Sequence, residues 1–83
     1  MRLSDLRKGA SATVESVDNV TQLDPIADRL RDLGFVRGEP VRLISQGPIG
    51  GDPLLVQIGF TRFALRRVEA ARVCVGVTGA SYS

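Results

Sequence analysis

The 83-residue sequence contains no histidine, no tryptophan and a single cysteine, Cys74. Without histidine, the chain cannot form Ser-His-Asp or Cys-His nucleophilic systems, and it lacks the commonest ligand of zinc and iron. One cysteine also excludes an internal disulfide. A metal site would need carboxylates, backbone groups and one thiolate, which is a weak ligand set for transition metals. We therefore predict a protein that is not an enzyme and that carries no cofactor.

Long apolar runs are also missing. No segment approaches the roughly 18 apolar residues of a membrane span. The opening MRLSDLRKGA places Asp5, Arg7 and Lys8 where a signal peptide would be apolar. These absences predict a soluble, cytoplasmic protein that does not insert into the membrane.

Aromatic residues make up only 5% of the chain, and the formal net charge is only +2. A small domain that binds nucleic acid usually has a more basic surface interleaved with stacking aromatics. Tyr82 is the only tyrosine, and it lies near the end of the sequence. We therefore predict that the partner is not a nucleic acid.

The composition that remains is that of an ordinary globular domain, with 43% hydrophobic and 24% charged residues. A chain of this length fills one core, so we predict a single domain over residues 1–83. Residues 77–83 form a small polar tail that we expect to fray. Cys74 lies in the apolar run VCVGV, where a cysteine is usually a small buried hydrophobe.

Period-two alternation predicts short strands. In SATVESV, Ala12, Val14 and Ser16 alternate with Thr13, Glu15 and Val17, which indicates a half-buried strand. The other predicted strands are VRLISQ, LLVQIGF, TRFALRR and VCVGV. Gly59, inside LLVQIGF, predicts a bulge or a sharp bend, and VEAAR predicts a helical turn.

One helix is expected at about residues 24–34. Asp24 can cap its first N–H groups, Pro25 suits the first helical position, and an apolar stripe follows at Ile26, Leu30 and Leu33. Gly34 suits the left-handed position that ends a helix, and Gly38 suits a second positive-φ turn before the next strand.

The segment GPIGGDP is expected to be a loop because three glycines and two prolines occur within seven residues. We assign a structural role in this turn to Gly51, Asp52 and Pro53. Gly34 and Gly38 have the same kind of role in the turns after the helix. About five short strands with one inserted helix predict a mainly β fold, a small partly open barrel of SH3-like type.

Four pieces of the sequence resemble one known family. LSDLRKGASATVESV, RLRDLGFVRGEPVRLI, PIGGDPLLVQIG and FALRRVEAARVCV occur in the order and spacing of the ferrous iron transport protein A (FeoA) family. The resemblance covers residues 3 to 77. The chain departs from the family at Arg37, where proline is frequent, and in the extra glycine of GGDP.

This resemblance implies a function. FeoA-like proteins are small cytoplasmic SH3-like barrels that work with FeoB, a membrane transporter with a cytosolic guanine-nucleotide-binding domain and a pore for ferrous iron. The resemblance implies an accessory protein that binds FeoB and regulates its activity in iron uptake, including the nucleotide hydrolysis by FeoB. The alternative is a metal-responsive or general protein-interaction module that is not tied to transport.

Candidate functional residues follow from their positions. For a partner surface we predict Phe35, Arg37, Ile49, Leu54 and Arg62. Ile49, flanked by Pro48 and Gly50, has little core to enter and is expected to be exposed. If the partner hydrolyses a nucleotide, Arg37 or Arg62 could serve as an arginine finger. Phe60 and Phe63 are expected in the core. Asp5, Glu15 and Asp18 are candidates for weak or adventitious metal binding, and exposed strand edges predict a monomer or a weak homo-oligomer.

Overall fold

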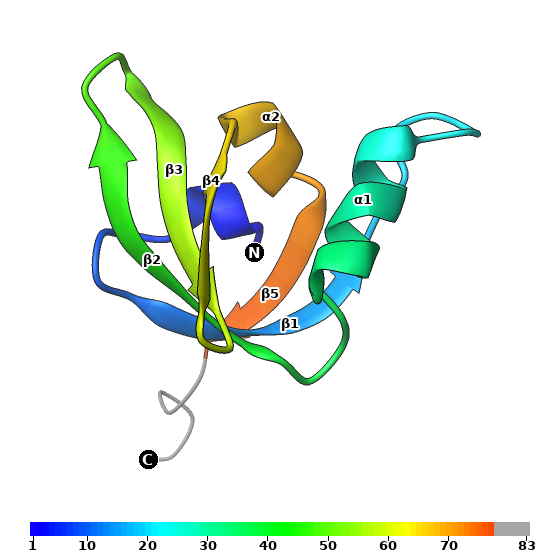
Figure 1. Cartoon of the computed structure of the whole chain (residues 1–83), viewed down its shortest axis with the longest axis horizontal. Coiled ribbons are helices and arrows are strands. Elements are labelled where there is room, and N and C mark those ends of the chain that lie inside the picture. The colour runs from blue at the N-terminus through cyan, green and yellow to red at the C-terminus, as the bar shows by residue number, and fades with distance from the viewer. Residues whose placement is uncertain (78–83) are drawn as a thin grey trace.

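Five antiparallel strands form one sheet that curls into an open barrel (Figure 1). The structure is a computed structural model, and it describes residues 1–77. The strands lie in the order β4-β3-β2-β1-β5. They are β1 (Ser11–Val17), β2 (Pro40–Gly47), β3 (Gly51–Ile58), β4 (Thr61–Leu65) and β5 (Val73–Val77). The predicted SH3-like fold is confirmed, while all of the predicted tail except Val77 lies outside the described residues.

Three helical segments complete the part of the fold that the structure describes. They are a 3₁₀ turn, η1 (Leu3–Asp5), the helix α1 (Pro25–Leu33) and the short helix α2 (Arg67–Ala70). In Figure 1, α1 lies to one side of the barrel and α2 lies beside the upper part of β4. None of the helices formed by residues 1–77 is long and apolar enough to cross a membrane.

The limits of α1 follow from local chemistry, as predicted. A side-chain oxygen of Asp24 accepts a hydrogen bond from the Ala27 N–H at 3.3 Å. Gly34 has a φ of 113°, and its N–H donates to the Arg31 carbonyl at 3.1 Å. Gly38 also has a positive φ, 93°, so both glycines of the helix-to-strand connection occupy the left-handed region.

The core lies inside the curled sheet and beneath α1. Phe35, directly after the end of α1, is buried, and its ring centroid lies 6.0 Å from that of the partly buried Phe63. The largest fully buried side chains are Leu3, Val14, Leu30, Phe35, Val41, Leu43, Leu54, Val56, Val73 and Val75.

A register shift in β1 corrects one predicted pattern. Val14 pairs with Val75 of β5, but Ser16 pairs with Cys74, so Glu15 is an extra residue on the β1 side. The shift reverses the alternation beyond Val14. Ser16 is therefore exposed and Val17 buried, opposite to the prediction.

The two hairpins are tighter than expected. Only residues 48–50 separate β2 from β3, so the predicted loop over residues 47–53 is wrong at both of its ends. Gly59 is not a bulge, but it does lie at a sharp bend, the other prediction: with Phe60 it forms a two-residue turn, because Ile58 pairs directly with Thr61. Gly59 has a φ of 60°, the conformation such a turn requires of its first residue.

Phe60 and Cys74 are also placed differently from the prediction. Phe60 is fully exposed, because a side chain at the tip of this turn has no core beneath it. Cys74 is half-buried because it alternates with Val73 and Val75, which point into the core. Phe63, which was also expected in the core, packs against it and is partly buried.

Candidate functional site

The five residues predicted to contact a partner do not form one surface. Phe35 and Leu54 are both buried. Phe35 packs against Phe63. Leu54 lies with Val56 on the inner face of β3. Because neither side chain can reach a partner while the core is intact, both are withdrawn from the candidate surface.

Ile49 forms the tip of the β2–β3 hairpin. Its side chain is 80% exposed, as predicted from the flanking Pro48 and Gly50. The Asp52 N–H donates to the Ile49 carbonyl at 3.0 Å, which fixes the tip. Ile49 borders a shallow hollow together with Asp52, Pro53 and Arg66. The tip therefore presents one large apolar side chain beside an arginine.

Arg37 and Arg62 lie at the opposite end of the sheet from Ile49. β3 has eight residues, so its two ends are separated by about 25 Å. Both arginines are exposed, Arg37 in the connection between α1 and β2 and Arg62 at the second residue of β4. The Arg62 Nε donates to Gln57 Oε1 at 3.3 Å.

A second hollow lies at this end, beside the β3–β4 turn that Phe60 occupies. It has a volume of about 210 Å³. Its lining comes from β1, β2, β3 and the turn: Ser11, Ala12, Pro40, Val41, Arg42, Gln57 and Gly59. Arg42 and Phe60 were not among the residues predicted to contact a partner, although the alternation in VRLISQ already places Arg42 on the side of its strand that faces away from the core.

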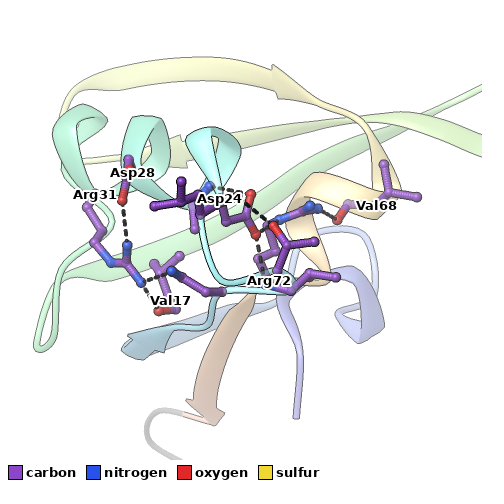
Figure 2. Close-up of polar contacts among 11 residues, drawn as sticks. Val17, Asp24, Asp28, Arg31, Val68 and Arg72 are labelled. Carbon is purple, nitrogen blue, oxygen red and sulfur yellow. Dashed lines mark hydrogen bonds and ion pairs between the residues drawn. The ribbon is translucent and has the colours of Figure 1, made fainter.

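A buried ion pair joins the start of α1 to the segment before β5 (Figure 2). Asp24 is only 3% exposed and accepts three hydrogen bonds: from Arg72 Nε at 2.8 Å, the Val20 N–H at 2.8 Å and the Ala27 N–H. The bond from Arg72, followed by the bond from the Val20 backbone, lowers the pKa of Asp24 to about 2. Arg72 also donates to the Val68 carbonyl at 2.7 Å, which ties α2 to the same point.

Arg31 makes a second connection from α1. Its guanidinium donates to the Val17 carbonyl at 2.6 Å, to Asn19 Oδ1 at 2.7 Å and to Asp28 Oδ1 at 3.0 Å (Figure 2). The Arg31 side chain therefore connects the helix to the end of β1 and to the residues that follow it. Both ionic groups in Figure 2 therefore have a structural role.

The three candidate metal-binding carboxylates are engaged in other contacts. Asp5 accepts a hydrogen bond from the Arg2 backbone N–H at 3.0 Å. Asp18 accepts one from the Arg2 guanidinium at 2.6 Å, and this bond lowers the pKa of Asp18. Glu15 Oε1 lies 3.6 Å from the Cys74 sulfur. Among residues 1–77, no group of three or more His, Cys, Asp or Glu side chains is placed to hold a metal ion.

The fold and its exposed turns define the class of protein: a small SH3-like barrel with one helix between its first two strands. The sequence matches the FeoA domain over residues 1–77, and the chain belongs to the FeoA family. Membership of this family supports a role as an accessory protein in ferrous iron transport.

Solved structures of several bacterial proteins are similar. FeoA of Stenotrophomonas maltophilia, complexed with zinc and described as an SH3 domain protein and a candidate ferrous iron transport activating factor, is 61% identical with a TM-score of 0.85. The match covers 90% of this chain and 88% of that chain.

Two further relatives support the same family. FeoA of Chlorobium tepidum is 35% identical, with a TM-score of 0.80 over 94% of this chain and 70% of that one. Iron(II) transport protein A of Clostridium thermocellum is 32% identical, with a TM-score of 0.81 over 95% of this chain and 46% of that one. No curated protein sequence matches the chain.

Proposed function

We propose that this protein binds the cytosolic side of a FeoB-type ferrous iron transporter and regulates its activity. The match to the FeoA domain over residues 1–77 is the observation that carries the proposal. The surface supports it, because Ile49 and Phe60 expose large apolar side chains at the two ends of β3. Both side chains lie on turns with no core beneath them, so they are available for contact with another protein.

Regulation of the transporter's nucleotide hydrolysis is part of this proposal. An arginine supplied by one protein to the nucleotide site of another can accelerate hydrolysis by about 10³–10⁵. Arg37 and Arg62 are the candidates from the sequence, and both are exposed at the same end of the barrel. Because they share this position, substitutions of the two arginines should be tested together, for their effect on nucleotide hydrolysis as well as on partner binding.

Ferrous iron uptake tests the proposed function directly. We expect cells that lack this protein to take up less ferrous iron under iron limitation, and the wild-type chain to restore uptake. Ile49→Ser is expected to restore it only in part, because loss of an apolar contact weakens partner binding by about tenfold or less. Uptake of radioactive Fe²⁺ and co-purification with the transporter measure the two effects.

Val20→Ser provides the matched control, since Val20 is another exposed apolar side chain, in the loop between β1 and α1. We expect this variant to restore uptake fully. Melting temperatures of both variants must equal that of the wild type. Unchanged uptake after deletion of the protein would refute the transport role.

Metal binding is a second candidate function, because the relative from Stenotrophomonas maltophilia was complexed with zinc. In this chain Glu15 and Cys74 place two ligand atoms side by side, half of the four that a structural zinc site uses. The described residues therefore do not fit a dedicated zinc centre, although they could contribute to a weak one.

We expect calorimetric titration with Zn²⁺ at micromolar protein to show no stoichiometric binding. Any weak heat of binding should disappear in Cys74→Ser, because the thiolate is the stronger of the two ligands. Asp32→Asn, at an exposed carboxylate on α1, serves as the control. One-to-one binding by the wild type at micromolar metal would contradict this expectation.

A further inference from the structure

We propose that the outer face of β2, β3 and β4 binds an acidic, extended segment of a partner protein. The inference rests on the proposed function for the identity of that partner, the FeoB-type transporter. It assigns the chemistry that the partner must present: carboxylates next to an apolar side chain. The site lies at the end of the barrel that carries the β3–β4 turn (Figure 1).

Strand register places four polar side chains in one row. Ser11 of β1 pairs with Arg42 of β2, Arg42 with Gln57 of β3, and Gln57 with Arg62 of β4. These residues alternate with inward-facing core residues, so their side chains occupy the outer face. Because neighbouring strands are about 4.8 Å apart, Arg42 and Arg62 are attached about 10 Å from each other.

Gln57 holds one end of this row in place. Its Oε1 accepts the Nε of Arg62 at 3.3 Å, and its Nε2 donates to the Gly59 carbonyl at 3.2 Å. The amide therefore links the Arg62 guanidinium to the β3–β4 turn. No hydrogen bond or ion pair to any residue of the described part of the chain engages the Arg42 guanidinium, so it can bind a ligand without first losing a partner.

The charge of this face has one sign. The outward positions of β2, β3 and β4, all within the described strands, include two arginines and no carboxylate. They are Pro40, Arg42, Ser45, Pro53, Leu55, Gln57, Arg62 and Ala64; Ile44 is an extra residue in β2, because Leu43 pairs with Val56 and Ser45 with Leu55. The nearest acidic residues along the chain lie at the strand ends: Glu39 precedes β2, and Asp52 accepts the Arg67 N–H at 2.8 Å. Complementary binding therefore calls for carboxylates on the ligand.

The hollow beside Arg42 provides the place for a carboxylate. It has about 210 Å³ of space, and Ser11 and Arg42 are both among the residues that line it. A guanidinium and a hydroxyl together can donate to both oxygens of one carboxylate. Arg62, on the other side of Gln57, can receive a second carboxylate of the same segment.

Apolar side chains flank the charged row and favour a protein ligand over a nucleic acid. Leu55 is half-buried on the same face, and Phe60 is fully exposed at the adjoining turn. An acidic segment with one apolar residue matches this combination. Single-stranded nucleic acid is bound by several stacking aromatics, whereas this face presents only Phe60.

The test compares Arg42→Gln/Arg62→Gln with Arg29→Gln, a control that removes an exposed charge from α1. Arg42→Gln alone removes one charge, as Arg29→Gln does, so these two single variants are compared directly. Three probes are used: the detergent-solubilised transporter, a fluorescent peptide that alternates aspartate with leucine, and an oligothymidine of equal charge. We expect the double variant to bind the transporter and the peptide about tenfold more weakly. Arg29→Gln should bind like the wild type, and all variants should keep the wild-type melting temperature.

Each outcome decides the proposal. Transporter binding that is equal in the wild type and the double variant overturns the site but leaves the proposed function intact. If the wild type does not bind the transporter, the proposed function fails, and peptide binding then decides the inference. Peptide binding that the double variant loses supports an acidic partner. Peptide binding that is absent, or equal in the wild type and the double variant, overturns the inference. Tighter binding of oligothymidine than of the peptide also overturns the proposal, in favour of nucleic acid.

Discussion

Asp24→Ala is expected to lower the melting temperature by about 15 °C. The substitution removes the cap of α1, leaves the Val20 and Ala27 N–H groups without their acceptor, and takes away the partner of Arg72. Arg72 is largely buried, and a buried charge that loses its partner destabilises a fold strongly. Thermal denaturation followed by circular dichroism measures the effect.

Asp32→Ala is the matched control, because Asp32 is an exposed carboxylate on the same helix. We expect its melting temperature to stay within a few degrees of the wild type. Asp24→Asn should fall between the two, since asparagine keeps a capping oxygen but not the charge. Equal losses in Asp24→Ala and Asp32→Ala would show that the ion pair does not stabilise the fold.

The same carboxylate makes stability depend on pH. The pKa of Asp24 falls from its ordinary value of 3.8 to about 2 in the folded protein, chiefly through the hydrogen bond from Arg72. A lowered folded-state pKa means that the unfolded chain binds the proton first as the pH falls. The contribution of Asp24 is therefore complete above about pH 4 and is lost between about pH 4 and pH 2. Urea unfolding across this range should show a steeper loss in the wild type than in Asp24→Asn.

Gly47→Ala is expected to have a comparably large effect. A Cβ at this position would overlap the Asp52 carbonyl oxygen and would lie 2.6 Å from the Asp52 carbonyl carbon and 2.7 Å from the Pro53 nitrogen. These are backbone atoms of the neighbouring strand, so relief requires β2 and β3 to separate near the hairpin. We expect a melting temperature at least about 10 °C lower, and altered amide NMR signals for residues 46–53.

Gly50→Ala separates this steric effect from a general effect of substituting glycine in the hairpin. Gly50 has a φ of 63°, but a Cβ there would meet no atom within 4 Å. Only the cost of the left-handed conformation remains, about 1–2 kcal/mol. Gly47→Ala should therefore be the more destabilised variant, and the reverse order would contradict the close approach of the two strands.

The sequence predicted those features that depend on neighbouring residues. Asp24, Pro25 and Gly34 set the limits of α1 through local hydrogen bonds and backbone preferences, so they were recognisable without any knowledge of the fold. Ile49 was predicted to be exposed because the proline and glycine on either side leave it no core to enter. The family and the SH3-like fold were likewise recognisable from the ordered motifs, and both are confirmed.

Features that depend on strand pairing were not recognisable. The bulge at Glu15 is defined only by the register between β1 and β5, and the fully exposed Phe60 only by the direct pairing of Ile58 with Thr61. The row that contains Arg42 and Arg62 requires the register of four strands. For the same reason Leu54, which follows a glycine-rich segment, was taken for a surface residue although it lies in the core.

The sheet order has a consequence for how the chain folds. β1 and β5 are adjacent, so Val14 pairs with Val75 across about 60 residues of intervening chain. The β2–β3 and β3–β4 hairpins have short connections and can form early, whereas β1 gains its second neighbour only after that long loop closes. Val73 and Val75 complete the core at the same step. Removal of β5 should therefore abolish cooperative folding of the whole barrel rather than shorten it by one strand.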